Sequence, residues 1–253
     1  MLKSFYYMFK TEKFWVKGLC YMGLVFISNL LTNYAQTLLP PCAKCAPPLS
    51  PVYWVCLISG MLLSLIPLGY VYSCIKSIID SEEEVSLPFM NLKEDFVKGF
   101  KYAVSMLALL LPLLVVVMLI IVGIAGVTLG SNLGAVISKT FLIFVILAFA
   151  FLLIGFNRLF AEEPRFSNFY RFKRVFELIS TGKRRYLGYV SLICVMFIIN
   201  MFLELFFGKN VALLGIGTTG ALIITGILCA ITGTYITFVI SYLTARSIKK
   251  PEA

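Results

Sequence analysis

The chain has 253 residues, of which 60% are hydrophobic and 13% charged, and its net charge is +10. Soluble domains are about 45–50% apolar and about 25% charged, so this composition leaves no room for a separate soluble catalytic domain. It predicts a single integral membrane domain over residues 1–253. Histidine is absent, which argues against serine–histidine intramembrane proteases and histidine-based metalloproteases.

Six apolar segments are each long enough to cross the ~30 Å hydrocarbon core, which takes about 20 helical residues. In chain order they are Gly18–Leu39, Val52–Ile75, Tyr102–Val127, Thr140–Phe160, Tyr186–Phe207 and Val211–Leu243. Such runs satisfy their backbone hydrogen bonds only as helices. The expected fold is therefore all-α: a polytopic bundle of six transmembrane helices in three hairpins, with amphipathic interfacial helices on the cytoplasmic side.

Lysine and arginine are distributed unevenly between the ends and loops of these spans. The N-terminal segment, the second and fourth loops and the C-terminal tail hold 19 of them, and the other three loops hold only Lys44, Lys139 and Lys209. By the positive-inside rule, both termini are expected in the cytoplasm and the protein in the cell membrane. The positive charge is read as a topology signal, and no nucleic-acid partner is expected.

A glycine followed by a tyrosine precedes or opens each odd-numbered span. Gly18, Gly99 and Gly182 are separated by 81 and 83 residues, and Tyr21, Tyr102 and Tyr186 follow them by three or four. This spacing predicts a threefold repeat with units 1–81, 82–163 and 164–253. Each unit would consist of an interfacial helix, a span outward, a short turn and a span back.

The predicted interfacial helices carry aromatic residues at helical spacing among basic ones. The stretches are MLKSFYYMFK, LKEDFVKGFKYAV and FYRFKRVFELI, the last with Phe169, Phe172, Phe176 and Ile179 on one side. Such helices lie in the headgroup plane and meet anionic lipid. The alternative is that they form a cytoplasmic docking surface for a membrane-protein partner, while homo-oligomerisation would run through the last span.

One stretch carries a family resemblance: GYVYSCIKSIIDSEEEVSLPFMNLKEDFVKGFKYAV. Its glycine–tyrosine start, acidic loop, Leu-Pro pair and phenylalanine-rich helix with a closing glycine resemble an uncharacterised prokaryotic family of multi-pass membrane proteins, domain of unknown function 4013. The matching residues are Gly69, Tyr70, Asp80, Leu87, Pro88, Phe96 and Gly99. The resemblance implies a bacterial or archaeal membrane protein and brings no reaction with it.

The first loop contains Cys42 and Cys45 between two proline pairs. The topology places this loop outside, where thiols can pair, so an external disulfide or two idle thiols are expected. Thiol exchange and metal binding are the alternatives. A zinc site would need two further ligands, and the sequence has neither histidine nor a second CxxC. No metal and no cofactor are therefore expected.

Three polar or small-residue features stand out within the spans. A stripe in the first span should face protein or water rather than lipid, as interhelical contacts or as the wall of a transport path; its residues are Asn29, Thr32, Asn33 and Gln36. A row in the last span predicts a close helix-packing seam: Ala221, Thr225, Cys229, Gly233, Thr237 and Ser241. Glu204 is expected at the outer interface.

Three functions compete on this sequence. Repeats, predicted helix kinks and the polar stripe favour a transport-related protein, such as a transporter, a channel or a permease-like subunit. A non-catalytic scaffold or assembly partner is the alternative. A membrane-embedded lipid enzyme comes last, because no acid–base or nucleophile pair converges, so no catalytic residue is assigned and the chain is not expected to be an enzyme.

Overall fold

The structure is a computed structural model. It describes residues 13–38, 50–81, 87–128, 132–181, 186–196, 198–199, 202 and 218–246. Every regular element among these residues is a helix, which confirms the all-α fold class. The elements are α2 (Phe14–Thr37), α3 (Pro51–Asp80), α4 (Leu92–Val127), α5 (Asn132–Glu162), η3 (Phe166–Tyr170), α6 (Phe172–Thr181), α8 (Thr218–Arg246) and the shorter helix Tyr186–Met196.

Four of the described helices are long and apolar enough to cross a membrane. These spans are Trp15–Gln36, Pro51–Asp80, Leu92–Ile124 and Gly226–Arg246. The predicted span Thr140–Phe160 lies within α5, and Tyr186–Met196 is a short apolar helix at the start of the predicted fifth span. The chain is thus an integral membrane protein, while the count of six spans and the three hairpins stay predictions.

Local capping explains where two of the long helices begin. The Ser50 side chain accepts a hydrogen bond from the Tyr53 amide, and Pro51 occupies the first turn of α3, where its missing N–H is not needed. The Asn91 side chain accepts one from the Glu94 amide at the start of α4. Each cap satisfies an amide of the first turn that has no partner within its helix, and so favours a helix start at this residue.

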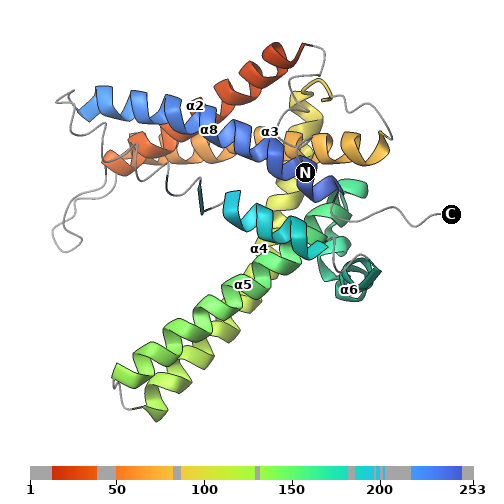
Figure 1. The fold of residues 1–253 in the computed structure, drawn as a ribbon. Coiled ribbons are helices and arrows are strands. Elements are labelled where there is room, and N and C mark those ends of the chain that lie inside the picture. The colour runs from red at the N-terminus through yellow and green to blue at the C-terminus, as the bar shows by residue number, and fades with distance from the viewer. Residues whose placement is uncertain are drawn as a thin grey trace.

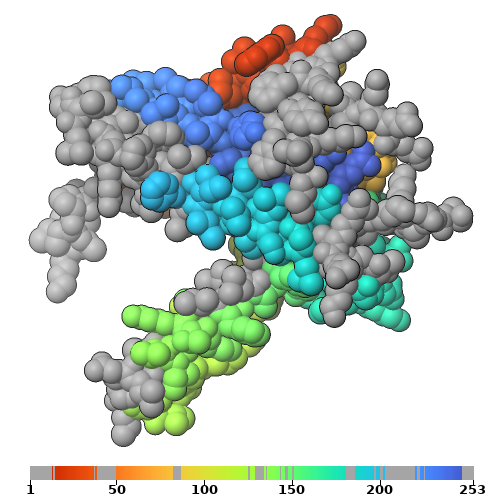
Figure 2. Space-filling view, viewed as in Figure 1, coloured from red at the N-terminus to blue at the C-terminus, as the bar shows by residue number. Residues whose placement is uncertain are grey.

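The helix α3 is the centre of the molecule, because it contacts α2, α4, α5 and α8. Figure 1 shows α2, α3 and α8 together, while α4 and α5 run side by side away from them. The space-filling view shows the far part of this α4–α5 hairpin standing clear of the other helices (Figure 2). Many apolar side chains along α4, including Leu111, Met118 and Leu119, are exposed there, as suits contact with lipid.

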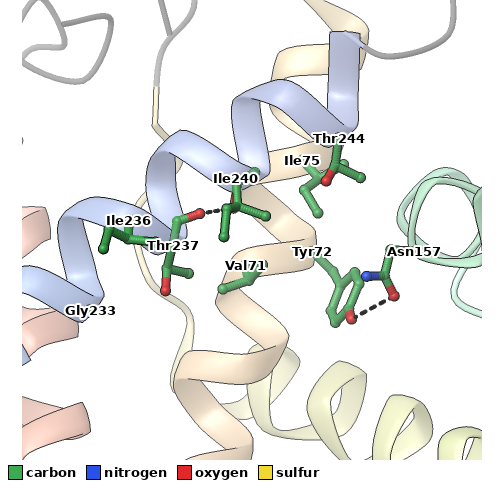
Figure 3. A pocket seen from close by; sticks show the side chains of 10 residues that line it. Val71, Tyr72, Ile75, Asn157, Gly233, Ile236, Thr237, Ile240 and Thr244 are labelled. Carbon is green, nitrogen blue, oxygen red and sulfur yellow. Dashed lines mark hydrogen bonds between the residues drawn. The ribbon is translucent and has the colours of Figure 1, made fainter. Parts of the chain in front are cut away.

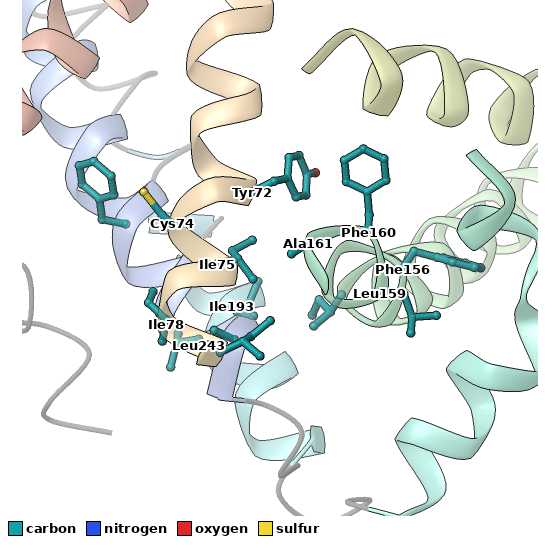
Figure 4. Close-up of a cluster of buried hydrophobic side chains, with 14 of the residues drawn as sticks. Tyr72, Cys74, Ile75, Ile78, Phe156, Leu159, Phe160, Ala161, Ile193 and Leu243 are labelled. Carbon is teal, nitrogen blue, oxygen red and sulfur yellow. The ribbon is translucent and has the colours of Figure 1, made fainter. Parts of the chain in front are cut away.

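The tightly packed core occupies one end of the helices. We call this end of the helices the basic end. The helices α2 and α4 begin there, and α3, α5 and α8 end there. The three tyrosines of the sequence repeat, Tyr21, Tyr102 and Tyr186, are all buried in this core. Figure 4 shows its aliphatic and aromatic side chains meeting from α3, α5, α8 and the helix that starts at Tyr186. Whether the three predicted units superpose stays a prediction.

The interfacial helices differ from the prediction in the second and third units. Residues 92–100 are the first turns of α4 and not a separate helix, because nothing interrupts the helix before Tyr102. In the third unit the stretch is divided between η3 and a separate α6, and the predicted face is not one surface. Phe169 and Ile179 are buried, whereas Phe172 and Phe176 are exposed. The corresponding residues of the first unit, 1–12, lie outside the described part of the chain.

Candidate functional site

The helices α3 and α4 cross in backbone contact at two glycines. A Cβ atom added to Gly69 would lie 1.7 Å from the carbonyl oxygen of Asp95, and one added to Gly99 would lie 1.9 Å from that of Leu65. Neither position has room for any side chain. The two glycines of the family-like stretch therefore set the distance between these helices.

The segment Leu87–Phe89 is tied to this crossing from two sides. The Tyr70 hydroxyl donates a 2.8 Å hydrogen bond to the Pro88 carbonyl. The Lys17 ammonium donates to the Leu87 carbonyl and lies 4.4 Å from the centroid of the Phe89 ring, a cation–π distance. Lys17 is only 7% exposed, so its charge is held by these contacts and not by water. The segment joins α2, α3 and α4 at the basic end.

Asp95 is a site residue that the sequence analysis missed. It is 2% exposed and accepts hydrogen bonds from the Ser73 hydroxyl, at 2.7 Å, and from the Asn91 amide, at 2.9 Å. Lys98 donates to the same Ser73 hydroxyl at 2.9 Å. The detectable signal was an asparagine cap with acidic residues in the first turn, as in a capping box. The sequence does not reveal that Ser73 on α3 completes the network.

A second polar junction connects three helices. The hydroxyls of Tyr72 on α3 and Tyr102 on α4 both donate to the side-chain oxygen of Asn157 on α5, at 3.3 and 3.0 Å. Their rings are 4.5 Å apart between centroids. Figure 3 shows the Tyr72–Asn157 bond beside α8.

A cavity of about 170 Å³ lies next to this junction, between α3, α5 and α8 (Figure 3). It is lined by Val71, Tyr72, Ile75, Asn157, Gly233, Ile236, Thr237, Ile240, Ser241 and Thr244. Half of these residues carry polar side chains, which offer four hydroxyls and one amide, and the other side chains are aliphatic. The cavity is large enough for a small uncharged molecule or a few waters.

The predicted packing seam of the last span partly borders this cavity. Gly233, Thr237 and Ser241 line it, and a Cβ atom added to Gly233 would meet no atom within 4 Å. Within the described chain Gly233 makes no close helix contact and borders the cavity, and the packing seam, inside the bundle or at a dimer interface, stays a prediction. The close glycine contact on α8 is Gly226, whose added Cβ would lie 3.1 Å from the Phe26 ring. Cys229 is half-buried, and the side chains of Ala221 and Thr225 are not described.

The polar stripe of the first span divides between two sides of α2. Ser28 donates to the Gly60 carbonyl of α3 at 2.8 Å, and Thr32, which is half-buried, donates to the Ser28 carbonyl. Asn29, Asn33 and Gln36 are exposed, and their side chains make no hydrogen bond to a described residue. None of the stripe lines the cavity.

Cys42, Cys45 and Glu204 lie outside the described residues, so the external disulfide and the interfacial acid stay predictions. Cys56 is half-buried with a free thiol. Among the residues with described placement, no group of three or more histidine, cysteine or acidic side chains is arranged to hold a metal ion.

Two arginines lie near the ends of α5 and α8, and one of them connects α8 to the end of α3. Arg158, which is buried, donates from Nε to Glu162 at 3.2 Å, and Arg246 donates to the Ser81 carbonyl at 3.1 Å. The Arg246 bond satisfies the carbonyl of the residue that caps α3, whereas the Arg158–Glu162 pair lies within α5. They close the basic end of the core.

Comparison with known proteins gives one match. A family model described as a protein of unknown function, DUF4013, matches residues 52–209, which includes α3, α4, α5 and α6. The matched range contains the glycine crossing and the Tyr70–Pro88 bond. Neither the curated proteins nor the solved structures give a match. Since the family model covers more than half of the chain, the protein belongs to the DUF4013 family.

Proposed function

We propose that the protein is a non-catalytic membrane assembly subunit whose α2 surface binds another membrane helix. The observation that carries the proposal is the exposure of Asn29, Asn33 and Gln36 within the candidate span Trp15–Gln36. Hydrocarbon offers Asn29 and Asn33 no hydrogen-bond partner, and leaving polar groups unsatisfied there is unfavourable by several kcal/mol, whereas Gln36 is the last residue of the span. A protein neighbour with polar side chains at the same depth removes that penalty.

The position of the amides supports assembly over transport. A transport path in this chain would use the cavity, which α3, α5 and α8 line without a contribution from α2. The three amides instead point away from the helices that α2 packs against. A polar face directed outward at membrane depth fits an intermolecular contact.

The basic end supports a structural role for the buried polar groups. Ser73 donates a hydrogen bond to Asp95 and accepts one from Lys98. Lys17 and Tyr70 donate hydrogen bonds to carbonyls of the segment Leu87–Phe89. These side chains fix the helices in place. The structural role of these polar side chains and the absence of histidine from the sequence favour a non-catalytic protein.

The orientation and the lipid contacts form part of the same proposal. We assign the basic end to the cytoplasmic face, because 19 basic residues belong to that side. On α6, Lys173 and Arg174 are exposed, and Phe176 is exposed beside them. Such a surface suits anionic lipid headgroups at the cytoplasmic interface.

The assembly role is testable by photocrosslinking from inside the membrane. A benzophenone amino acid replaces Asn29 in one variant and Ile27 in a matched control. The two positions lie about 3 Å apart along α2 and about 160° apart around it, and both are exposed. We expect a protein adduct of one defined mass from position 29 and only lipid adducts from position 27. Lipid adducts alone from both positions would refute the assembly role.

The cavity favours a second candidate, a transport-related role. A transported molecule must reach the cavity from each side of the membrane in turn. Cysteine variants at Gly233 and Thr237, both of which line the cavity, test this with a membrane-impermeant thiol reagent. Labelling from both faces supports transport, and labelling from one face only counts against it.

A further inference from the structure

The exposed amides belong to a longer row on α2. Successive steps of four and three residues along one side of the helix give Trp15, Leu19, Met22, Phe26, Asn29, Asn33 and Gln36. This alternation is the heptad spacing by which two helices pack along a left-handed seam. The first two side chains are 70% and 56% exposed, Met22 and Phe26 are half-buried, and the three amides are exposed. We call this row the α2 seam.

We propose that the α2 seam pairs with the α2 seam of a second copy of this chain, forming a parallel homodimer around a twofold axis along the membrane normal. The proposal rests on the assembly role above and names the partner. Both copies enter the membrane in the same orientation, so such an axis makes their α2 helices parallel. Each seam residue then faces its own counterpart.

The chemistry of the amides favours a second copy as the occupant. Each asparagine or glutamine side chain both donates and accepts hydrogen bonds, so an amide facing its own counterpart is matched in type and in depth. Three amides occur at consecutive seam positions, and the twofold axis aligns all three pairs at once. A different partner would need amides or similar groups at the same three depths.

The seam also has the shape that pairing requires. The opposite side of α2 is used within the chain, where Lys17, Tyr21, Ser28 and Ala35 are buried against the rest of the protein. Phe26 marks the border, because its ring also approaches Gly226 of α8. The seam is one exposed flank of α2, with large apolar residues toward the basic end and amides toward the other, while Val16, Ile27 and Tyr34 are exposed on the other flank.

The test identifies the partner of the seam directly. Two differently tagged full-length copies are expressed in one cell, and the benzophenone amino acid replaces Asn33 in one of them, or Ile27 in the control. We expect an adduct that carries both tags from position 33 and none from position 27. An adduct with another protein would overturn the homodimer and leave the assembly role standing. Lipid adducts alone would overturn both.

A second measurement tests the role of the amides in pairing. Purified protein labelled with donor and acceptor dyes is reconstituted in vesicles of neutral lipid, and energy transfer is followed as the protein is diluted with lipid. We expect Asn33→Leu to weaken dimerisation about fivefold to tenfold, because one pair of hydrogen-bonded amides is lost. The control Ile27→Leu should dimerise like the wild type. Unchanged dimerisation of Asn33→Leu would overturn the amide pairing.

Discussion

Replacing Gly69 by alanine should push α3 and α4 apart at their crossing. The added Cβ would lie 1.7 Å from the Asp95 carbonyl oxygen, whereas real Cβ contacts essentially never fall below 3.0 Å. The backbones must therefore separate by about 1.3 Å, and no flexible side chain can absorb the change because both clashing groups are main chain. The same displacement strains the Ser73–Asp95 and Tyr70–Pro88 hydrogen bonds next to it.

The size of this effect follows from two opposing contributions. Overpacking a well-packed contact costs about 1–3 kcal/mol, and a backbone clash belongs at the upper end. Alanine in place of glycine inside a helix gains about 1 kcal/mol through helix propensity. We therefore expect Gly69→Ala to lower the free energy of unfolding by about 2 kcal/mol or more. That corresponds to roughly 4–8 °C in thermal midpoint for a chain of this size.

Gly233→Ala provides the matched control. It makes the same chemical change inside another candidate membrane helix, but its new methyl group meets no atom within 4 Å. Only the helix-propensity gain remains, so this variant should be as stable as the wild type or slightly more so. The assay is thermal unfolding of both variants in the same detergent. Equal stability of Gly69→Ala and Gly233→Ala would refute the reasoning from the close crossing.

Three further results are expected. Asp95→Ala should destabilise the protein by about 1–3 kcal/mol in the same assay, because the Ser73 hydroxyl and the Asn91 amide lose their acceptor; the neighbouring exposed Glu94→Ala should change stability by less than about 0.5 kcal/mol. Tyr70→Phe should lower the free energy of unfolding by about 1 kcal/mol, because the Pro88 carbonyl loses its hydrogen-bond donor. An unchanged thermal midpoint would contradict a stabilising role for this hydrogen bond. Reporter fusions in the three loops that are poor in basic residues should read as external, and a cytoplasmic signal from any of them would overturn the topology; the fusion points are Lys44, Lys139 and Lys209.

The membrane class and much of the helical architecture could be read from the sequence. The favourable free energy of transfer into the membrane adds up along a long apolar run, so the run can be recognised from sequence alone. Four of the predicted spans coincide with or lie largely within the candidate membrane helices, and Thr140–Phe160 lies within α5. The family-like stretch was also recognisable. The sequence identified the residues of the motif but not their structural roles. Nothing in the order of amino acids says that Gly69 approaches Asp95 or that Tyr70 reaches Pro88.

Only the tertiary structure decided which side of each helix meets protein. In a membrane helix both the lipid-facing and the protein-facing sides are apolar, so hydropathy does not separate them. The stripe on α2 shows the consequence: Thr32 faces α3, whereas Asn33, one residue further on, faces away. In the same way Gly233 resembles a packing residue in the sequence and borders a cavity in the fold. Close packing depends on distances between segments far apart in the chain, and these distances are set by all helices together.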